Sequence, residues 1–398
     1  MKFSNLVISL VASVASVEAS ARYVLYADQY HLKGLPNSTV TKGITHVIMA
    51  FENSSLFTTS PPGNYTPFEP LSAMPTNSTR ASYASNIASM LDTMGFDGVD
   101  IDWEYPGGNG QDYKQSPNFE KSIKSAIGEK ELSIAVPGLQ RDMIAYTAKQ
   151  APKIWESVDF VNIMTYDLMN RRDNITVHHT SVNGSAVVID HCLNVLGLPP
   201  AKANLGFAFY AKYFTQDPAG HCENGLGCTM VALENKDGSD SGKSAAMTFE
   251  TANYVSSVGN LTESPDGSCG PSVGHFCSTG NCCGAYGFRG SSSDYCGTNC
   301  LSDYGNCTAV SATTLFRSAM ANGTTDEDAG AEYYYDSANN VFWTWDTPQL
   351  IAKKFTLIVK SRHLGGVIAW SGGEDSYSWS HLLALQSGVA AMGSCENL

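Results

Sequence analysis

Three acidic side chains stand at alternate positions in one short and otherwise apolar run of the chain. Asp100, Asp102 and Glu104 are separated by Ile101 and Trp103. Because side chains two residues apart on a β-strand point to the same face, this spacing predicts a row of three carboxyl groups. Carboxyl groups held that close cannot all ionise cheaply, so one is expected to keep a proton, as a general acid requires. The row therefore predicts acid–base chemistry.

An exposed acidic strand or a cation-binding loop could also carry such a row. Both are disfavoured because Val99, Ile101 and Trp103 alternate with the carboxyl groups and require burial on the opposite face. Glu104 also ends its predicted strand, and barrel enzymes assemble their active sites at the C-terminal ends of strands. The position of the row thus favours a catalytic site.

Short runs rich in Val, Ile and Phe alternate with longer helical patterns, which is typical of βα units around a parallel sheet. The predicted strands are residues 23–26, 45–51, 98–103, 132–136, 160–166, 204–210 and 366–370. The predicted helices are residues 80–94, 119–127, 141–157, 186–196 and 348–362. A length of 398 residues suits one elaborated α/β barrel or two domains. An eight-stranded barrel needs one more strand, and the interval 52–79 supplies no apolar run for it.

A long Gly- and Cys-rich interval follows the sixth predicted strand. Residues 215–343 are too many for a connection within a compact domain, so we expect an inserted α+β region between barrel parts 20–214 and 344–390. Its cysteines are Cys269, Cys277, Cys282, Cys283, Cys296, Cys300 and Cys307. This density indicates a small disulfide scaffold. A zinc site is disfavoured because no CxxC or CxxH spacing occurs. With 11 cysteines in all, at least one thiol stays unpaired within a monomer.

The net charge of the chain limits its possible partners, and the composition of its N-terminal residues predicts its location. Lys and Arg number 24 against 38 Asp and Glu, a net charge of -14, which disfavours nucleic acid and anionic membrane surfaces as partners. Residues 1–19 are expected to be a signal peptide, with an apolar run too short to span a bilayer. Glycosylation acceptors occur at Asn37, Asn53, Asn64, Asn77, Asn174, Asn183, Asn260, Asn306 and Asn322. We expect a secreted, extracellular, monomeric glycoprotein.

The run from Asp97 to Glu104 is similar to the DxxDxDxE signature of family 18 glycoside hydrolases, the chitinases. The segments 164–167 (Met-Thr-Tyr-Asp) and 206–210 (Gly-Phe-Ala-Phe-Tyr), together with Trp370, support the resemblance, which covers most of residues 22–381. It implies a TIM-type (β/α)8 barrel, and within the family the chain looks most like secreted fungal chitinases. One departure is the absence of the family's Ser-x-Gly-Gly motif from 52–94. Either a βα segment is missing there, or residues 56–74 close the barrel irregularly.

The resemblance also implies catalytic roles, with the substrate's own N-acetyl oxygen as nucleophile. Glu104 would protonate the glycosidic oxygen and later activate water. Asp102 would orient the acetamido N–H and steady the oxazolinium ion, and Asp100 would share the proton of Asp102. The implied substrate-binding residues are Met164, Tyr166, Asp167, Tyr210, Trp370 and Tyr105. For several of these, ordinary structural roles stay open: Trp370 and Tyr210 in barrel packing, and Asp167 as a strand-end cap.

Residues 266–308 resemble the hevein-type chitin-binding module. That resemblance implies a sugar-stacking platform of Tyr286, Phe288 and Tyr295, with Gly284 where the family has a Ser. The alternative is that these aromatics fill a small core. The implied disulfides are 269 with 283, 282 with 296, and 300 with 307. Arg289 stands where the family has a Cys, which leaves Cys277 without its partner. Cys222 and Cys228 are also expected to form disulfides.

Taken together, these features predict a chitinase that binds chitin and chitooligosaccharides and needs no metal or cofactor. The adjacent His178 and His179 are not expected to bind a metal, because neighbouring side chains point apart and no carboxylate–His motif accompanies them. One alternative is a non-catalytic chitin-binding lectin, which the missing strand favours and the intact Glu104 opposes. The other is an endo-β-N-acetylglucosaminidase acting on glycoprotein glycans, which the chitin-binding insert disfavours.

Overall fold

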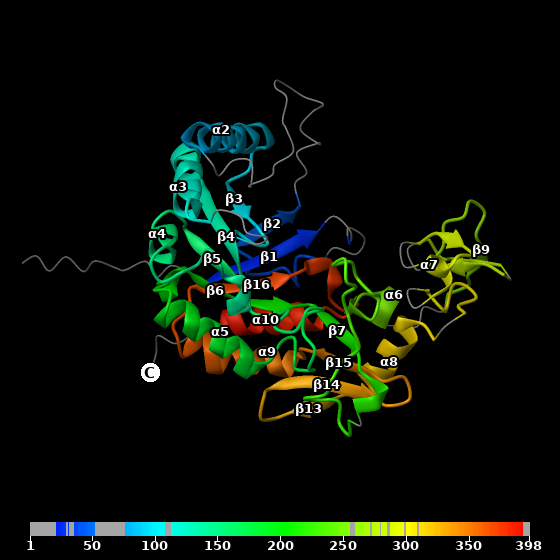
Figure 1. Cartoon of the computed structure of the whole chain (residues 1–398). Coiled ribbons are helices and arrows are strands. Elements are labelled where there is room, and N and C mark those ends of the chain that lie inside the picture. The colour runs from blue at the N-terminus through cyan, green and yellow to red at the C-terminus, as the bar shows by residue number, and fades with distance from the viewer. Residues whose placement is uncertain are drawn as a thin grey trace, which may run out of the picture.

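A computed structural model of the chain describes residues 21–28, 31, 36–51, 76–107, 113–220, 222–254, 259–270, 273–278, 280–284, 287–297, 300–308 and 310–392. Its main sheet has seven parallel strands in the order β2-β1-β16-β6-β5-β4-β3. These are β1 (Arg22–Asp28), β2 (His46–Ala50), β3 (Gly98–Ile101), β4 (Glu131–Pro137), β5 (Phe160–Met164), β6 (Ala203–Ala208) and β16 (Gly366–Trp370). The sheet curls into a nearly closed TIM-type barrel with helices outside it (Figure 1). All seven predicted strands are therefore present.

Within the described residues, no strand joins β2 to β3, the two strands at the ends of the sheet order. A cavity of about 510 Å³ lies there, lined by Val47 and Met49 of β2 and by Ile87 and Leu91 of α2 (Asn77–Met94). Its lining also includes His46 and Glu131, and the His46 ring nitrogen Nε2 lies 3.0 Å from the Glu131 carboxylate. The predicted irregular closure by residues 56–74 falls outside the described residues.

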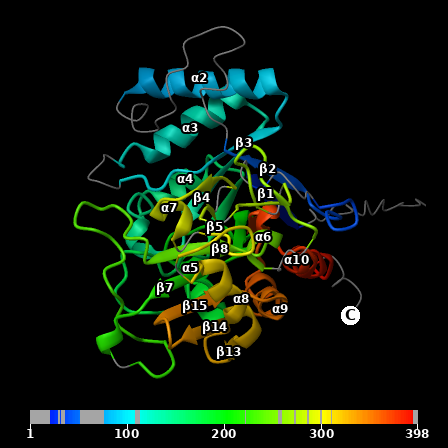
Figure 2. The ribbon, with the colours of Figure 1, turned by 90° about the vertical axis from the view of Figure 1, so that its right-hand side faces the viewer.

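Helices cover the outside of the barrel and bury their apolar faces against its strands. Helices α2 and α3 (Ser116–Ile127) lie side by side beyond β3 (Figure 2). The other barrel helices are α5 (Val182–Asn194), α9 (Pro348–Lys354), which continues as a π-helix (Phe355–Lys360), and α10 (Ser380–Ala390). Between strands and helices lies the largest apolar cluster, with Phe119, Trp155 and Phe355 among its buried members.

One predicted helix, at residues 141–157, is wrong over most of its length. The chain there forms a 3₁₀ turn (Gln140–Asp142), then irregular backbone, then the short helix α4 (Ala151–Trp155). Pro152 explains the late start, because its ring fixes φ for a first helical turn and excludes a preceding one.

A second, antiparallel sheet is built from the inserted region, in the order β13-β14-β15-β7-β8. Its strands are β7 (Tyr210–Thr215), β8 (Ser244–Thr248), β13 (Thr324–Asp326), β14 (Ala331–Asp336) and β15 (Val341–Trp345), and helices α6 (Thr251–Tyr254) and α8 (Ala312–Asn322) accompany them. The buried Phe316 of α8 packs on Trp343 of β15. The sheet reaches a few residues beyond the 215–343 insertion expected from the sequence, since Tyr210 begins β7.

The Cys-rich segment forms a small body of its own, which stands away from the barrel in Figure 1. It contains β9 (Thr262–Glu263) paired with β10 (His275–Phe276), β11 (Cys282–Cys283) paired with β12 (Arg289–Gly290), and α7 (Ser293–Cys296). Its disulfides are Cys269–Cys283, Cys282–Cys296 and Cys300–Cys307, the three pairs that the resemblance implies. Cys222–Cys228 is also bonded, while Cys192 and Cys277 are free and buried.

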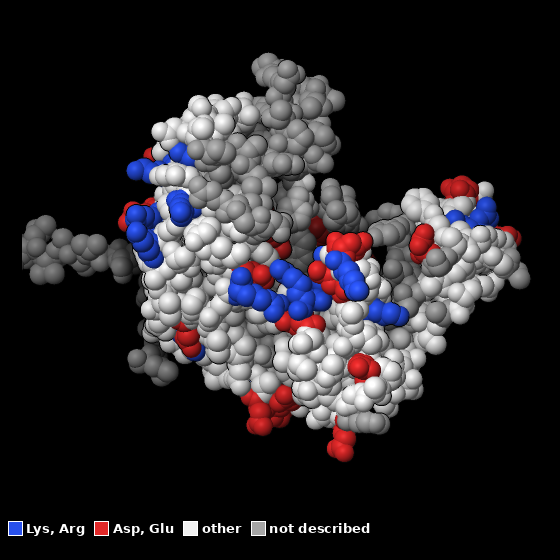
Figure 3. Space-filling view, viewed as in Figure 1, with Lys and Arg blue, Asp and Glu red and all other residues white. Residues whose placement is uncertain are grey.

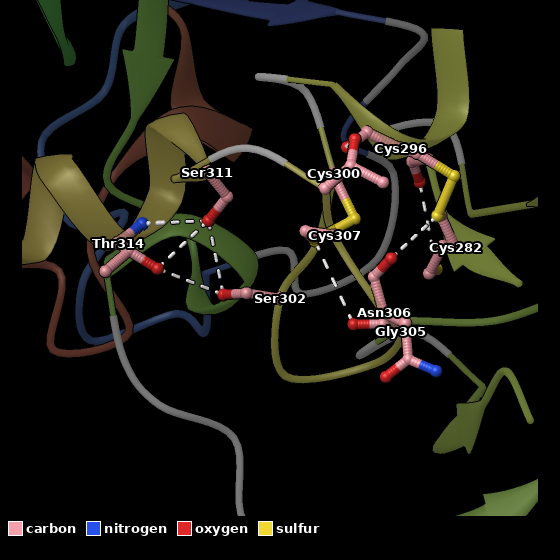
Figure 4. Close-up of a disulfide and its surroundings, with 12 residues drawn as sticks. Cys282, Cys296, Cys300, Ser302, Gly305, Asn306, Cys307, Ser311 and Thr314 are labelled. Carbon is pink, nitrogen blue, oxygen red and sulfur yellow. Dashed lines mark hydrogen bonds between the residues drawn. A yellow bond between two sulfur atoms is a disulfide. The ribbon is translucent and has the colours of Figure 1, made fainter. Parts of the chain in front are cut away.

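Hydrogen bonds attach this segment to helix α8. The Ser311 hydroxyl, which caps α8, lies 3.2 Å from the Ser302 hydroxyl and 3.0 Å from that of Thr314 (Figure 4). Nearby, Arg317 of α8 donates to the Asp303 carboxylate at 2.6 Å. No helix in the described part of the chain has the length and apolar character needed to span a membrane.

Charged side chains of both signs share the molecular surface. On the face shown in Figure 3, basic and acidic groups are intermixed rather than gathered into separate areas. Ion pairs account for part of this pattern in the chain: Arg141 donates to the Asp173 carboxylate at 2.9 Å, and Arg171 donates to that of Glu234 at 2.9 Å. Positive charge is thus partly neutralised where it occurs, in a chain whose net charge is already -14.

Candidate active site

A cleft of about 250 Å³ opens at the C-terminal ends of the barrel strands. It is lined by Tyr26, Phe51, Asp102, Glu104, Tyr105, Ala135, Gly138, Leu139, Asp142, Met164, Tyr166, Asp167, Tyr210 and Trp370. The barrel residues predicted from the sequence to bind or cleave substrate all line this cleft except Asp100. Among these predicted residues, the structure brings together side chains that are up to 268 residues apart in the sequence, from Asp102 to Trp370.

Asp100 lies below the cleft, on β3, and is held by three donors. The Tyr26 hydroxyl donates to it at 2.7 Å, the Ser133 hydroxyl at 2.6 Å and the Asn162 amide at 3.0 Å. Burial raises the pKa of Asp100, and these hydrogen bonds oppose the rise. Sequence reasoning missed the three donors, although their positions on neighbouring predicted strands carried a signal: polar residues pointing into a barrel need partners.

Asp102 follows the end of β3 and has a different environment. Its oxygen Oδ1 is buried without a hydrogen-bond partner. Burial, with the charges of Glu104 and Asp100, raises the pKa of Asp102 to about 8, so this carboxyl group is mostly protonated at neutral pH. No hydrogen bond joins it to Asp100 among the described residues. The strand ends at Ile101, two residues earlier than predicted, so the row of three carboxyl groups is not a regular strand feature.

Glu104 reaches into the cleft and is exposed to solvent there. Partial burial by the cleft walls raises its pKa, and the charges of Asp167 and Asp142 add to the rise. Hydrogen bonding with Tyr105 and the charge of Lys212 act in the opposite direction. A raised pKa on an accessible carboxyl group is what a proton donor at neutral pH requires.

Asp167 is the ionised acid of the site. Its Oδ1 accepts a hydrogen bond from Tyr210 at 2.8 Å and lies 3.1 Å from Lys212 Nζ and 3.7 Å from the ring nitrogen Nδ1 of His179. Burial opposes ionisation, yet these neighbours together hold the pKa of Asp167 well below its ordinary value. Its backbone is left-handed (φ 53°), a conformation that Asp tolerates better than most residues. Lys212 and Asp142 were not predicted from the sequence.

Aromatic rings form one wall of the cleft. Trp370, at the end of β16, stacks on Phe51 with ring centroids 5.4 Å apart and an interplanar angle of 29°, and it also contacts Tyr26. Phe51 is 46% exposed, which leaves a partly open apolar surface beside the acids. Tyr166 and Tyr210, in contrast, are almost buried and pack edge to face.

Comparison with known proteins identifies the family of the chain. The sequence model described as "Glycosyl hydrolases family 18" matches residues 71–375, most of the chain. The protein belongs to glycosyl hydrolase family 18. Of its curated relatives, a Mus musculus protein named "Chitotriosidase-1" is 30% identical over 176 residues, 38% of this chain and 37% of the relative. "Endochitinase 1" of Metarhizium robertsii is 23% identical over 350 residues, 82% of this chain and 63% of the relative. The family 18 chain thus spans between about a third and two thirds of the length of these relatives.

Solved structures share the fold. A family 18 N-acetylglucosaminidase from Paenibacillus barengoltzii superposes with a TM-score of 0.59 at 18% identity, covering 92% of this chain and 99% of that one. At this identity the match supports the barrel architecture of the family 18 chain and nothing finer.

The adjacent residues His178 and His179 lie in different environments. His178 lies 3.1 Å from the Thr344 hydroxyl and 3.0 Å from the Asp326 carboxylate. His179 is fully buried and stacks on Tyr210, with neither ring nitrogen hydrogen-bonded. Two other groups in the described residues each bring three potential metal ligands within 4.8 Å of one another: Asp28, His31 and Glu374, and Cys269, Cys277 and Cys283, of which two are disulfide-bonded.

In the Cys-rich segment, the aromatic residues predicted to form the sugar-stacking platform differ in their exposure to solvent. Phe288 is 60% exposed. Tyr295 is half-buried and packs against the cluster of Cys282, Cys296 and Cys300. Tyr286 lies outside the described residues. Phe288 is therefore the more open of the two described aromatics, while Tyr295 also has a packing role.

Proposed function

We propose that this chain is a secreted chitinase of the fungal type that hydrolyses β-1,4-linked N-acetylglucosamine as a monomer. The observation that carries the proposal is the pairing of Glu104, exposed in the cleft with a raised pKa, with Asp102, whose Oδ1 is buried and unpartnered. A proton donor and a free acceptor side by side suit an acetamido sugar, which offers both a glycosidic oxygen and an N–H group.

In the proposed reaction, Glu104 gives its proton to the glycosidic oxygen as the bond from C1 to that oxygen breaks. The carbonyl oxygen of the substrate's acetamido group bonds to C1 from the opposite face, giving an oxazolinium ion. Asp102 Oδ1 accepts the acetamido N–H and holds the group in place. Water then attacks C1 as the bond from C1 to the acetamido oxygen breaks, and the Glu104 carboxylate takes up a proton from that water. This step restores both Glu104 and the acetamido group and retains the β configuration.

The surrounding residues would position this chemistry. Asp100, anchored from three sides, would fix β3 directly below Asp102. Tyr210 and the ionised Asp167 would contact the acetamido group, and Trp370 with Phe51 would stack on the sugar ring. Residues 266–308 would act as a hevein-like module that holds the enzyme on insoluble chitin, with Phe288 in its binding face. The four disulfides among the described residues suit an extracellular location.

A chitin-binding lectin on the same scaffold is the second candidate, because no strand of the described residues joins β2 to β3 and a cavity lies there beside Asp100 and Asp102. The test is product analysis on colloidal chitin and chitooligosaccharides with the parent protein, Glu104→Gln and the exposed control Glu129→Gln. The parent and Glu129→Gln should release short oligosaccharides, whereas Glu104→Gln should bind chitin and lose at least about a hundredfold in turnover. A parent protein that binds chitin and releases no product would establish the lectin.

A further inference from the structure

Three buried sulfur atoms meet in the core of the Cys-rich segment. The Sγ atoms of Cys269, Cys277 and Cys283 lie within 4.8 Å of one another, and each residue is at most 4% exposed. Cys269 and Cys283 form a disulfide, whereas Cys277 is a free thiol. In the described part of the chain, no other three cysteines come this close together. A thiol held against a disulfide is the arrangement from which thiol–disulfide exchange starts.

We propose that Cys277 exchanges with the Cys269–Cys283 disulfide, so that the segment exists as covalent isomers. In the exchange, the Cys277 thiolate attacks Cys283 Sγ and a Cys277–Cys283 bond forms as the Cys269–Cys283 bond breaks. The electron pair leaves on Cys269, which takes up the proton that Cys277 released. If the Cys277 thiolate instead attacks Cys269 Sγ, a Cys269–Cys277 bond forms and Cys283 becomes the free thiol. The numbers of disulfides and thiols stay constant, so no oxidant or reductant is needed.

The surroundings of Cys277 make this exchange slow. Burial raises the pKa of its thiol, and the positive charge of Arg289 opposes the rise without cancelling it. Because only the thiolate attacks, most encounters between these sulfurs are unproductive. The isomers should therefore interconvert on the scale of minutes to hours, and each can be trapped.

The exchange would change how the exposed Phe288 is held. Cys269 N–H donates to the Gly287 carbonyl at 2.8 Å, and Arg289 N–H donates to the Gly267 carbonyl at 2.7 Å, so residues 267–269 run beside Phe288. In the isomer shown, the Cys269–Cys283 bond fixes that segment covalently to β11. In the Cys277–Cys283 isomer this covalent link is absent, and the backbone hydrogen bonds to Gly287 and Arg289 remain. This goes beyond the proposed function, and its covalent readout does not depend on chitin binding.

The first test counts free thiols in full-length variants produced in an oxidising secretory host, by alkylation in denaturant and mass spectrometry. In Cys269→Ser, the proposal predicts a new Cys277–Cys283 bond and hence one fewer alkylated cysteine than the parent. If the three sulfurs do not exchange partners, Cys277 and Cys283 both stay free and the count rises by one. Cys300→Ser is the matched control and its count should rise by one, since no third cysteine among the described residues lies within 4.8 Å of both Cys300 and Cys307.

The second test uses the unaltered chain and so does not depend on a variant that folds. The native protein is incubated for hours, alkylated in denaturant at mildly acidic pH without reduction, digested and mapped. The proposal predicts Cys277 as the main alkylated site in this segment, with a minor, time-dependent population in which Cys277 is disulfide-bonded and Cys269 or Cys283 is alkylated. Alkylation at Cys277 alone at every time point would overturn it.

Discussion

The ammonium group of Lys212 lies 3.1 Å from the same Asp167 oxygen that accepts the Tyr210 hydrogen bond. Lys212 belongs to β7 of the second sheet, whereas Asp167 follows β5 of the barrel. The second sheet therefore supplies the charge that keeps a cleft carboxylate ionised, while Asp102 and Glu104 in the same cleft have raised pKa values.

Replacing Lys212 with Met should raise the pKa of Asp167 toward its ordinary value, because the largest stabilising charge is removed. Asp167 would then gain a proton at a higher pH, so the acidic limb of the pH–activity profile should move upward by about one pH unit. Activity at neutral pH should change less than activity in acid. The exposed Lys243→Met is the control and should leave the profile in place. An unchanged acidic limb in Lys212→Met would show that Asp167 titration does not limit activity.

The products of chitooligosaccharide hydrolysis should keep the β configuration when first released. Two successive inversions at C1, by the acetamido oxygen and then by water, give net retention. Proton NMR recorded during the first turnovers distinguishes the anomers before mutarotation mixes them. An initial excess of the α-anomer would contradict the role given to the acetamido group and indicate direct attack by water.

Glu120 on α3 predicts a pH dependence of stability. Its side chain is buried, and burial raises its pKa to about 8. The folded state then binds more protons than the unfolded state between about pH 4.5 and pH 8, so stability falls as pH rises through that window. Glu120→Gln should be nearly neutral at about pH 5 and more stable than the parent at about pH 8, by on the order of 1 kcal/mol or more. Urea unfolding at both pH values tests this, with the exposed Glu129→Gln as control.

Lys354 of α9 and Asp346 form a fully buried ion pair at 2.6 Å, with Thr180 donating to the same carboxylate at 3.0 Å. Lys354→Met should lower the unfolding free energy by about 3–5 kcal/mol, because it leaves Asp346 charged and buried. The double variant Lys354→Met with Asp346→Leu should recover much of that loss. Equal instability of the single and double variants would argue that Lys354 acts by packing alone.

Phe288→Ala should weaken retention on chitin beads several-fold, since a stacked aromatic contact contributes about 0.5–1.5 kcal/mol beyond area burial. Replacing all three predicted aromatics, Tyr286, Phe288 and Tyr295, should lower retention more than about tenfold. Turnover of a short soluble chitooligosaccharide should be unchanged in both. The exposed Val273→Ala, in the same segment, is the control for surface apolar area. Full retention in a folded triple variant would mean that this segment has a structural role only.

Strand positions could be predicted from local periodicity, and the acidic row from its spacing. The other predicted cleft residues, such as Tyr166 and Trp370, are implied by the resemblance to family 18. What could not be predicted depends on contacts between distant segments. Asp100 and Asp102 look equivalent in the sequence. In the structure, Asp100 accepts three hydrogen bonds, whereas Asp102 has a buried oxygen without a hydrogen-bond partner. Lys212 looks like an ordinary strand lysine until β7 is placed against the barrel. Pro152 did signal the late start of α4, but the apolar pattern around it outweighed that signal.

The edges of β2 and β3 that lack a partner strand in the described part of the chain affect how easily these strands can detach. Among the described residues, β2 is hydrogen-bonded on one side only, to β1, and β3 on one side only, to β4. Strands β16, β6 and β5 have a neighbour on each side. Detaching β2 or β3 from the sheet therefore breaks one ladder of backbone hydrogen bonds, whereas detaching β16 or β6 breaks two. Since β3 leads directly into Asp102 and Glu104, the proposed catalytic acids follow a strand that is held by a single ladder of backbone hydrogen bonds within the described residues.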